Sequence, residues 1–179
     1  ALSPNGPSWP NPPWSTLMLR KMMTNPGFRN EFANQFADRI NTNFESGRVS
    51  SVIDSLRQII LPEIDNHLYR WGLSESNWNY NFECLYRFAE QRPEYVRSHI
   101  RAKLNLDGLL DIAVQTNSPG TGKVKVNSVI PDTYPFSGVY FRNVPIRLTA
   151  VPEPGFKFSR WEGSVNSSSM SIDYDMSIS

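Results

Sequence analysis

The chain has 179 residues, 18 basic and 17 acidic side chains and a formal net charge of +1, enough for one large domain or two small ones. The charge balance argues against a nucleic-acid-binding protein, an acidic tail or a polybasic membrane patch. A hydrophobic content of 39% supports a packed core, while a single cysteine excludes an intramolecular disulfide and a zinc site built from several thiolates.

Residues 1–13 contain five prolines. Proline lacks the amide hydrogen that a helix needs, so this composition predicts an extended segment. We interpret residues 1–13 as a lead-in and expect the chain to be a fragment of a longer protein.

The apolar residues from position 14 to 107 follow a helical spacing. Ser15 is expected to cap a short first helix, and Asn25-Pro26 to start a second with asparagine as the N-cap. The second helix carries an apolar residue at every fourth position, which predicts one continuous packing ridge. These residues are Phe28, Phe32, Phe36, Ile40 and Phe44.

Three more helical stretches follow. Ser46 is expected to open a third helix, which Pro62 kinks or breaks and which ends at Gly72. A fourth helix is expected around residues 78–89, and Pro93 is expected to start a last stretch that reaches Leu104.

After Asp107-Gly108 the apolar residues alternate with polar ones, which is typical of half-buried strands. The alternating runs lie at residues 110–114, 124–126, 146–150, 156–158 and 172–176. The sequence therefore predicts the α+β class: an N-terminal all-α helical domain of residues 14–107, then a small antiparallel all-β repeat domain of residues 108–179 with five or six strands.

The run Gly120-Thr121-Gly122-Lys123 resembles the end of a phosphate-binding loop. Such a loop needs Ser or Thr after the lysine and a following helix whose amides hold the phosphates. Val124 occupies the first position and a strand is expected to follow. The pattern favours a β-turn.

Other reactive side chains are scattered. Glu63 and His67 share a helix face, which favours a surface pair near Pro62 because third and fourth metal ligands are missing. Cys84 lies among apolar residues, which favours a buried, inert thiol. Nothing local supports a Cys–His–Asp triad, and the chain is expected not to be an enzyme by itself.

Two arginine–tryptophan pairs, Arg70-Trp71 and Arg160-Trp161, are the candidates for a binding surface. A tryptophan can stack on a sugar ring or close a core. Packing in a core or hinge is the favoured interpretation for both pairs, and ligand contact is the alternative.

Residues 15–44 resemble the C-terminal part of the spore-coat CotH kinase family, and three further stretches agree in order and spacing. They are Val52-Ile53-Asp54, Leu61-Pro62-Glu63-Ile64 with His67 and Arg70-Trp71, and the run from Phe88 to Val96. The resemblance implies a kinase-like fold that transfers a phosphoryl group from ATP to secreted proteins.

The resemblance also implies that the nucleotide-holding lysine, the catalytic aspartate and the metal-binding Asp-x-Asp of the family lie upstream of the matched segment. Asp173-Tyr174-Asp175 has the letters of that motif but falls on alternate, outward-facing positions of a predicted strand. No catalytic, cofactor-binding or metal-binding residue is therefore assigned to this chain. ATP and magnesium are implied only for the upstream kinase-like core of the same polypeptide, which is the expected partner.

The second half resembles divergent internalin B-type repeats of bacterial surface proteins. Gly122–Asn127 and the run from Pro145 to Gly163 carry the likeness: an alternating strand, a Pro-Gly turn, two phenylalanines and Trp161. Leu148 and Ala150 are expected to face inward and Gly155 to support the turn, so that the aromatic residues close a small core.

The leading hypothesis is a non-catalytic C-terminal fragment of a secreted or cell-surface bacterial CotH-like protein, in which the helices are a scaffold and the β repeat spaces or displays it. The alternative is a stand-alone module that binds a surface glycan or protein. An enzyme in its own right ranks third, and neither a nucleic-acid partner nor a membrane span is expected.

Overall fold

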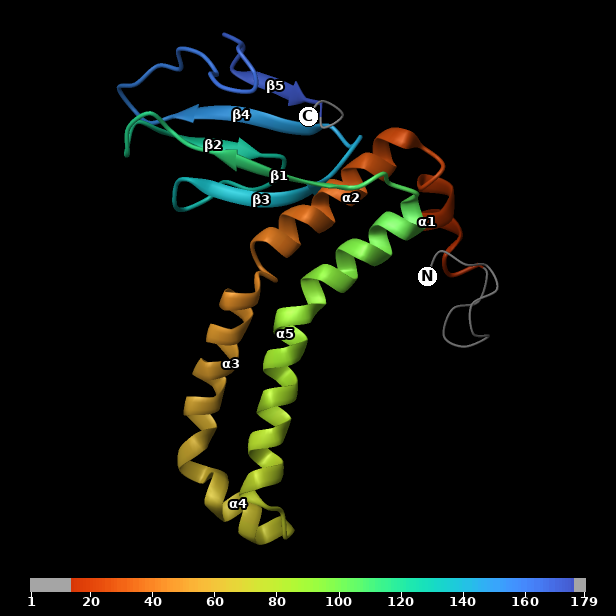
Figure 1. The fold of residues 1–179 in the computed structure, drawn as a ribbon, viewed down its shortest axis with the longest axis vertical. Coiled ribbons are helices and arrows are strands. Elements are labelled where there is room, and N and C mark those ends of the chain that lie inside the picture. The colour runs from red at the N-terminus through yellow and green to blue at the C-terminus, as the bar shows by residue number, and fades with distance from the viewer. Residues whose placement is uncertain (1–13, 176–179) are drawn as a thin grey trace. The chain divides into compact units, whose positions relative to one another are not determined.

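The computed structural model describes residues 14–175, and the predicted lead-in of residues 1–13 lies outside them. All described helices end by Leu104 and all described strands begin at or after Leu109, so the α+β class is confirmed (Figure 1). The described chain divides into two compact units. One comprises Ala37–Asn105, and the other combines Ala1–Phe36 with Leu106–Ser179, so the boundary falls inside the second helix.

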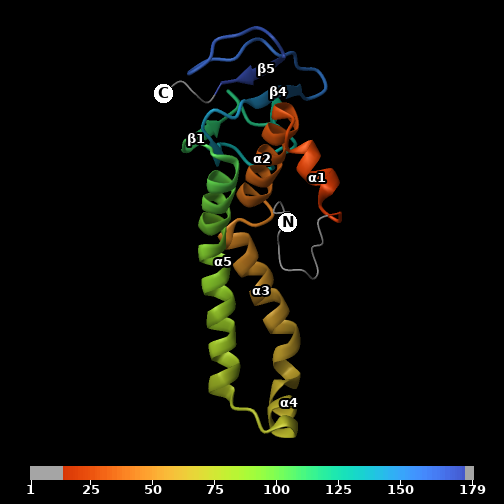
Figure 2. The same cartoon turned by 90° about the vertical axis from the view of Figure 1, so that its right-hand side faces the viewer.

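The helical unit is a long hairpin. Its helices are α3 (Ser46–Ile60), the short 3₁₀ helix η1 (Leu61–Glu63), α4 (Ile64–Trp71) and α5 (Glu75–Leu104). Figures 1 and 2 both show α3 and α5 side by side, with α4 near the turn between them. Pro62 interrupts the helix as predicted, and Gly72 ends α4 with φ +61°, a left-handed conformation that suits glycine.

One of the two predicted N-caps needs correction. Asn25 does cap α2 (Pro26–Asn41): its Oδ1 accepts the Phe28 amide at 3.1 Å. Ser15 does not cap α1 (Leu17–Met22), whose N-cap is Thr16. Ser46 opens α3 as predicted. Glu45 before it takes the cap position, and its carboxylate accepts the amides of two following residues.

The prediction that Pro93 starts a new helix is wrong, because α5 runs unbroken from Glu75 to Leu104 with Pro93 inside it. Proline removes the hydrogen bond that its amide would donate to the carbonyl of Ala89 and crowds that carbonyl. The bonds on either side keep the helix continuous, and the axis of α5 bends along its length in Figure 1.

The predicted ridge on α2 is wrong as one packing face. Phe36 and Phe44 are exposed, whereas Ala33, Ala37 and Ile40 are buried. A residue every fourth position advances about 400° around the helix, so a long run of such residues spirals away from any single face. Only Phe28 and Phe32, whose tilted rings have centroids 6.3 Å apart, are half-buried together.

The strands of the other unit form two antiparallel sheets. β1 (Leu109–Val114) pairs with β3 (Phe136–Phe141), and β4 (Ile146–Pro152) lies between β2 (Gly122–Val126) and β5 (Ser171–Tyr174). The sequence prediction missed β3. It also placed a strand at residues 156–158, where the structure has irregular backbone.

The core of this unit lies between the sheets. Leu148 and Ala150 face inward as predicted, and Tyr140, Phe141 and Ile146 are fully buried. Gly155 has φ +89°, which confirms its role in the turn after β4. Phe156 is exposed, so the predicted aromatic closure is carried by Phe158 and Trp161.

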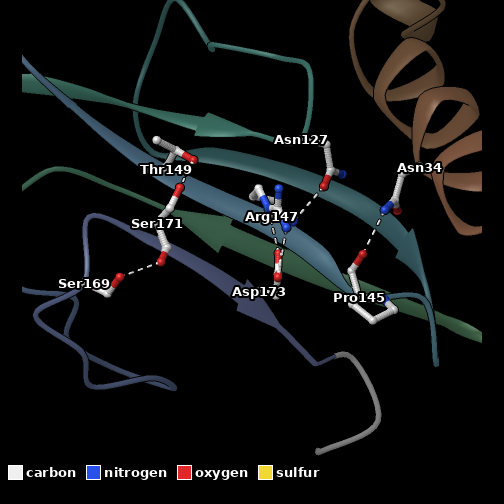
Figure 3. A network of polar contacts seen from close by, with 8 residues as sticks. All are labelled: Asn34, Asn127, Pro145, Arg147, Thr149, Ser169, Ser171 and Asp173. Atoms are coloured by element: carbon white, nitrogen blue, oxygen red, sulfur yellow. Dashed lines mark hydrogen bonds and ion pairs between the residues drawn. The ribbon is translucent and has the colours of Figure 1, made fainter. Parts of the chain in front are cut away.

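The first half of α2 is tied to this unit by polar contacts. Asn34, which is 5% exposed, donates from Nδ2 to the carbonyl of Pro145 at 2.8 Å, immediately before β4 (Figure 3). Ser128 donates to the side-chain oxygen of Gln35 at 3.4 Å. This packing explains why the first part of α2 clusters with the strands.

Candidate functional site

The first arginine–tryptophan pair ends α4 in the helical unit. The guanidinium of Arg70 lies 5.6 Å from the centre of the Trp71 ring, and the Trp71 side chain is 63% exposed. An exposed indole beside a cation offers an apolar face to a ligand or to another part of a protein.

The second pair lies in the loop between β4 and β5. Arg160 forms an ion pair with Glu162 at 2.6 Å. Trp161 is half-buried: its ring packs against Phe158 with centroids 5.2 Å apart, and its Nε1 donates to the carbonyl of Ser169 at 2.9 Å. Trp161 therefore has a structural role in holding this loop, and the part of it that remains exposed borders a cleft.

The cleft has a volume of about 440 Å³ and lies between the two sheets. Its apolar floor comes from the inner faces of β4 and β5, through Ile146, Leu148, Ile172 and Tyr174. One wall is β1, where the five consecutive residues 111–115 line it, and the opposite wall is the loop of residues 161–165. Asp111 and Glu162 place carboxylates at the two walls.

The polar face of the β2–β4–β5 sheet is held by a cross-strand network (Figure 3). Arg147 donates to both oxygens of Asp173, at 2.8 and 3.0 Å, and Thr149 is hydrogen-bonded to Ser171. The Arg147 guanidinium lowers the pKa of the Asp173 carboxyl. Asp173 therefore pairs with a cation on the outer face of the sheet, as its predicted outward position requires.

The helical unit carries a row of exposed apolar side chains along α3. Val52, Leu56, Ile59 and Ile60 follow each other at helical spacing along α3 and are 46–72% exposed, and we call these four residues the α3 stripe. No residue of α3 is buried. Exposed side chains on α5 add to this apolar surface: Leu85, Phe88 and Tyr95.

Contacts between α3 and α5 fix which side of α3 remains open. The guanidinium of Arg57 lies over the rings of Trp78 and Phe82, at 5.0 and 4.9 Å, and donates to Asn79 at 2.7 Å. Tyr86 donates its hydroxyl to Asp54 at the same interface, and this bond raises the pKa of the tyrosine. The side chains of α3 that contact α5 here are the polar residues Asp54 and Arg57. The apolar residues of the α3 stripe lie on another side of the helix and stay uncovered.

The other sequence candidates do not assemble a reactive site. Gly120–Lys123 leads into strand β2, as predicted for a β-turn. Glu63 and His67 are both exposed, and Glu63 accepts from Asn66 at 3.4 Å. Cys84 is half-buried on α5, less buried than predicted, and its sulfur accepts from Arg87 at 3.4 Å.

The residues present do not fit a magnesium–nucleotide site. Within residues 14–175, no three His, Cys, Asp or Glu side chains gather closely enough to hold a metal ion. The glycine-rich turn precedes a strand, so it lacks the helix N-terminus that would hold a phosphate. No step of phosphoryl transfer is therefore assigned to these residues.

The sequence reasoning named Trp161 but missed the cleft beside it. The alternating pattern of residues 110–114 predicted a strand and could not show that one edge of that strand borders a cavity. The cleft was missed because strand β3 was not predicted. Without knowing that β1 pairs with β3, one cannot tell which edge of β1 is the outer one.

Comparison with protein families gives a match over the first half of the chain. The family described as CotH kinase protein matches residues 2–96, slightly more than half of the chain. Neither the curated proteins nor the solved structures gave a significant match. Among the helices of residues 14–175, none combines the length and apolarity needed to cross a bilayer.

Proposed function

Because the chain belongs to the family of CotH kinase proteins, we propose that its helical unit is a non-catalytic scaffold in the C-terminal part of a longer CotH protein. The remainder of the kinase-like core of that polypeptide covers the α3 stripe. ATP and magnesium belong to that remainder, and this chain supplies helices that support it.

The observation that carries the proposal is the exposure of the α3 stripe. Fully burying one such side chain stabilises a structure by about 1.5–3 kcal/mol. Single exposed apolar residues are normal on a protein surface, but here four follow each other along one helix. Such a row is typical of a surface that another part of a protein covers. The stripe lies inside the segment that matches the family, residues 2–96.

The β unit has a separate role in the proposal. We infer that it spaces or displays the CotH domain outside the cytoplasm, on the support of the likeness of residues 145–163 to bacterial surface repeats. A second candidate function is a stand-alone module that binds a surface glycan or protein. The cleft beside Trp161 favours it, because an aromatic ring, apolar floor and carboxylates meet there.

The scaffold role predicts that the chain binds the upstream core of its own protein through the α3 stripe. We would express that upstream segment and this chain separately and measure their affinity by isothermal titration calorimetry. The double variant Leu56→Lys with Ile59→Lys should weaken binding by about a hundredfold, since two lost side chains cost about 3 kcal/mol or more.

The matched control places the same charges on the opposite side of α3, through Ser51→Lys with Gln58→Lys, both at exposed positions. This pair should leave the affinity unchanged. Equal binding by the two double variants, with folding checked by circular dichroism, would refute the scaffold role.

A further inference from the structure

The outer edge of β1 carries backbone groups with no partner strand. In an antiparallel pair, residues alternate between those that exchange hydrogen bonds with the partner and those whose N–H and C=O point away. Arg142 donates its amide to Gly108 at 3.0 Å, which places Ile112 among the residues that bond to β3 in the register Ile112↔Gly138. The amides and carbonyls of Asp111 and Ala113 therefore point to the outer edge, and β1 pairs only with β3 among the described strands.

The cleft between the sheets runs along this same edge. Both the buried Ile112 and the exposed Asp111 and Ala113 line it, so it follows the edge of β1 and not only its inner face. The inner faces of β4 and β5 form the floor of the cleft. An additional strand placed beside β1 would therefore lie over this apolar floor. The sheet containing β1 has two strands and the other sheet has three.

The corresponding edge of the other sheet is closed by the protein itself. On β2, the residues whose backbone points outward are Val124 and Val126. The Tyr134 hydroxyl accepts the amide of Val124 at 2.7 Å and donates to its carbonyl at 3.2 Å, and Val126 exchanges two hydrogen bonds with Val129 at 2.8 Å. Natural sheets cover or block their edges in this way, so an edge left open beside an apolar cleft is informative.

We propose that this cleft binds a polypeptide segment in extended conformation, which adds to the outer edge of β1 as a third strand. Its main chain bonds to Asp111 and Ala113, and its alternate side chains are apolar and pack on Ile146, Leu148 and Ile172. Strand addition of this kind obtains affinity from the backbone bonds and specificity from the side chains. A basic residue at an exposed end of the segment suits the carboxylate of Asp111, which lines the cleft. The proposal does not depend on the scaffold role of the helical unit.

The probe is a capped peptide as long as β1, in which valine alternates with threonine and a lysine stands at each end. Added to the full chain, it should slow amide hydrogen exchange at Asp111 and Ala113, measured by NMR, and leave Ile112 unchanged because that amide already bonds to β3. Exchange at Asp111 and Ala113 that the saturating peptide does not alter would overturn the proposal. Protection of these amides by a xylan or cellulose oligosaccharide in place of the peptide would overturn it equally.

Two further arms locate the bound strand. Of two peptides N-methylated at all valines or at all threonines, only one should bind, because an added strand bonds to β1 through one alternate set of amides. Equal binding by both N-methylated peptides contradicts strand addition.

In the protein, Ala113→Pro removes an outward amide without touching the bonds to β3 and should weaken binding by about tenfold or more. The matched variant Ser137→Pro removes an outward amide at the far edge of β3 in the same sheet and should leave the affinity unchanged. A loss with Ser137→Pro alone would place the peptide at the outer edge of β3 and refute the proposal. The exchange measurement uses the unaltered chain, so the test holds even where a proline variant fails to fold.

Discussion

Single polar side chains determine where several elements begin and how neighbouring strands align. Glu45 caps α3, and its side chain accepts the amides of Gly47 and Arg48 at 3.0 and 2.8 Å. These two bonds lower the pKa of the Glu45 carboxyl. A carboxylate at a helix N-terminus also interacts favourably with the helix dipole.

Replacing Glu45 with alanine should reduce the free energy of unfolding by about 0.5–1 kcal/mol, the usual cost of a lost N-cap. Because the folded pKa is depressed, the carboxylate stabilises the fold above its ordinary pKa of 4.5 and loses this effect as the pH falls below that value. Urea denaturation at pH 7 and at pH 3 checks this. The difference between Glu45→Ala and the wild-type chain should shrink at the lower pH, and a constant difference would contradict it.

Asp173 gives a second prediction at this scale. Its pKa lies below the ordinary value of 3.8, chiefly because of the hydrogen bonds from Arg147. Arg147→Gln should raise the pKa of Asp173 toward 3.8, as followed by an NMR titration of the carboxyl carbon. Both side chains are more than half exposed, so added salt should also raise this pKa. An unchanged Asp173 pKa in Arg147→Gln would show that the ion pair does not form in solution.

At the scale of elements, α5 is held together in spite of Pro93. The residue is half-buried within a 30-residue helix, and the neighbouring turns supply the hydrogen bonds that it cannot. An interior proline costs a helix about 3 kcal/mol relative to alanine. The length of α5 therefore depends on its packing and on its caps, where Ser74 accepts the amide of Asn77 at 3.2 Å.

Pro93→Ala should increase the free energy of unfolding by about 1–3 kcal/mol, because it restores the amide that bonds to the carbonyl of Ala89. Thermal denaturation by circular dichroism measures the change. Gln91→Ala is the matched control on the exposed side of the same turn and should have an effect near zero. A Pro93→Ala chain less stable than wild type would mean that the bend itself is required for packing.

The elements that could be predicted were those with strong local signals. Asn25-Pro26, Pro62 and Gly72 gave correct boundaries because caps and breakers act within one helical turn. Strand β3 was not predicted because its apolar and polar residues do not alternate clearly around Gly138 and Tyr140. Its partner β1 also lies far away in the sequence. The cleft could not be predicted either, since it depends on the pairing of strands and not on any residue alone.

At the scale of the whole molecule, the two units differ in how they complete their surfaces. The β unit buries Tyr140, Phe141 and Ile146 in a core of its own. The helical unit buries few large side chains, Leu68, Phe82 and Leu104 among them, and leaves the α3 stripe exposed. By itself, the helical unit should therefore tend to associate with itself through that stripe.

Ile59→Lys should reduce self-association of the chain, followed by sedimentation velocity at increasing protein concentration. The isoleucine side chain is 72% exposed, so its removal costs little folding stability. Gln58→Lys adds the same charge one residue away on the opposite side of α3. If the two variants self-associate to the same extent, the net charge of the chain, and not the α3 stripe, controls its self-association.

The hydroxyl of Tyr134 has a consequence for polymerisation. A fibre built by joining sheets edge to edge needs two open edges on each copy, one to receive a strand and one to offer it. Tyr134 and Val129 occupy the outer edge of β2, so the sheet of β2, β4 and β5 can be extended only from β5. Two copies could then join through their β5 edges, but no third copy could be added to this sheet. The Tyr134 hydroxyl, by occupying the backbone groups of Val124, limits such assembly to a dimer.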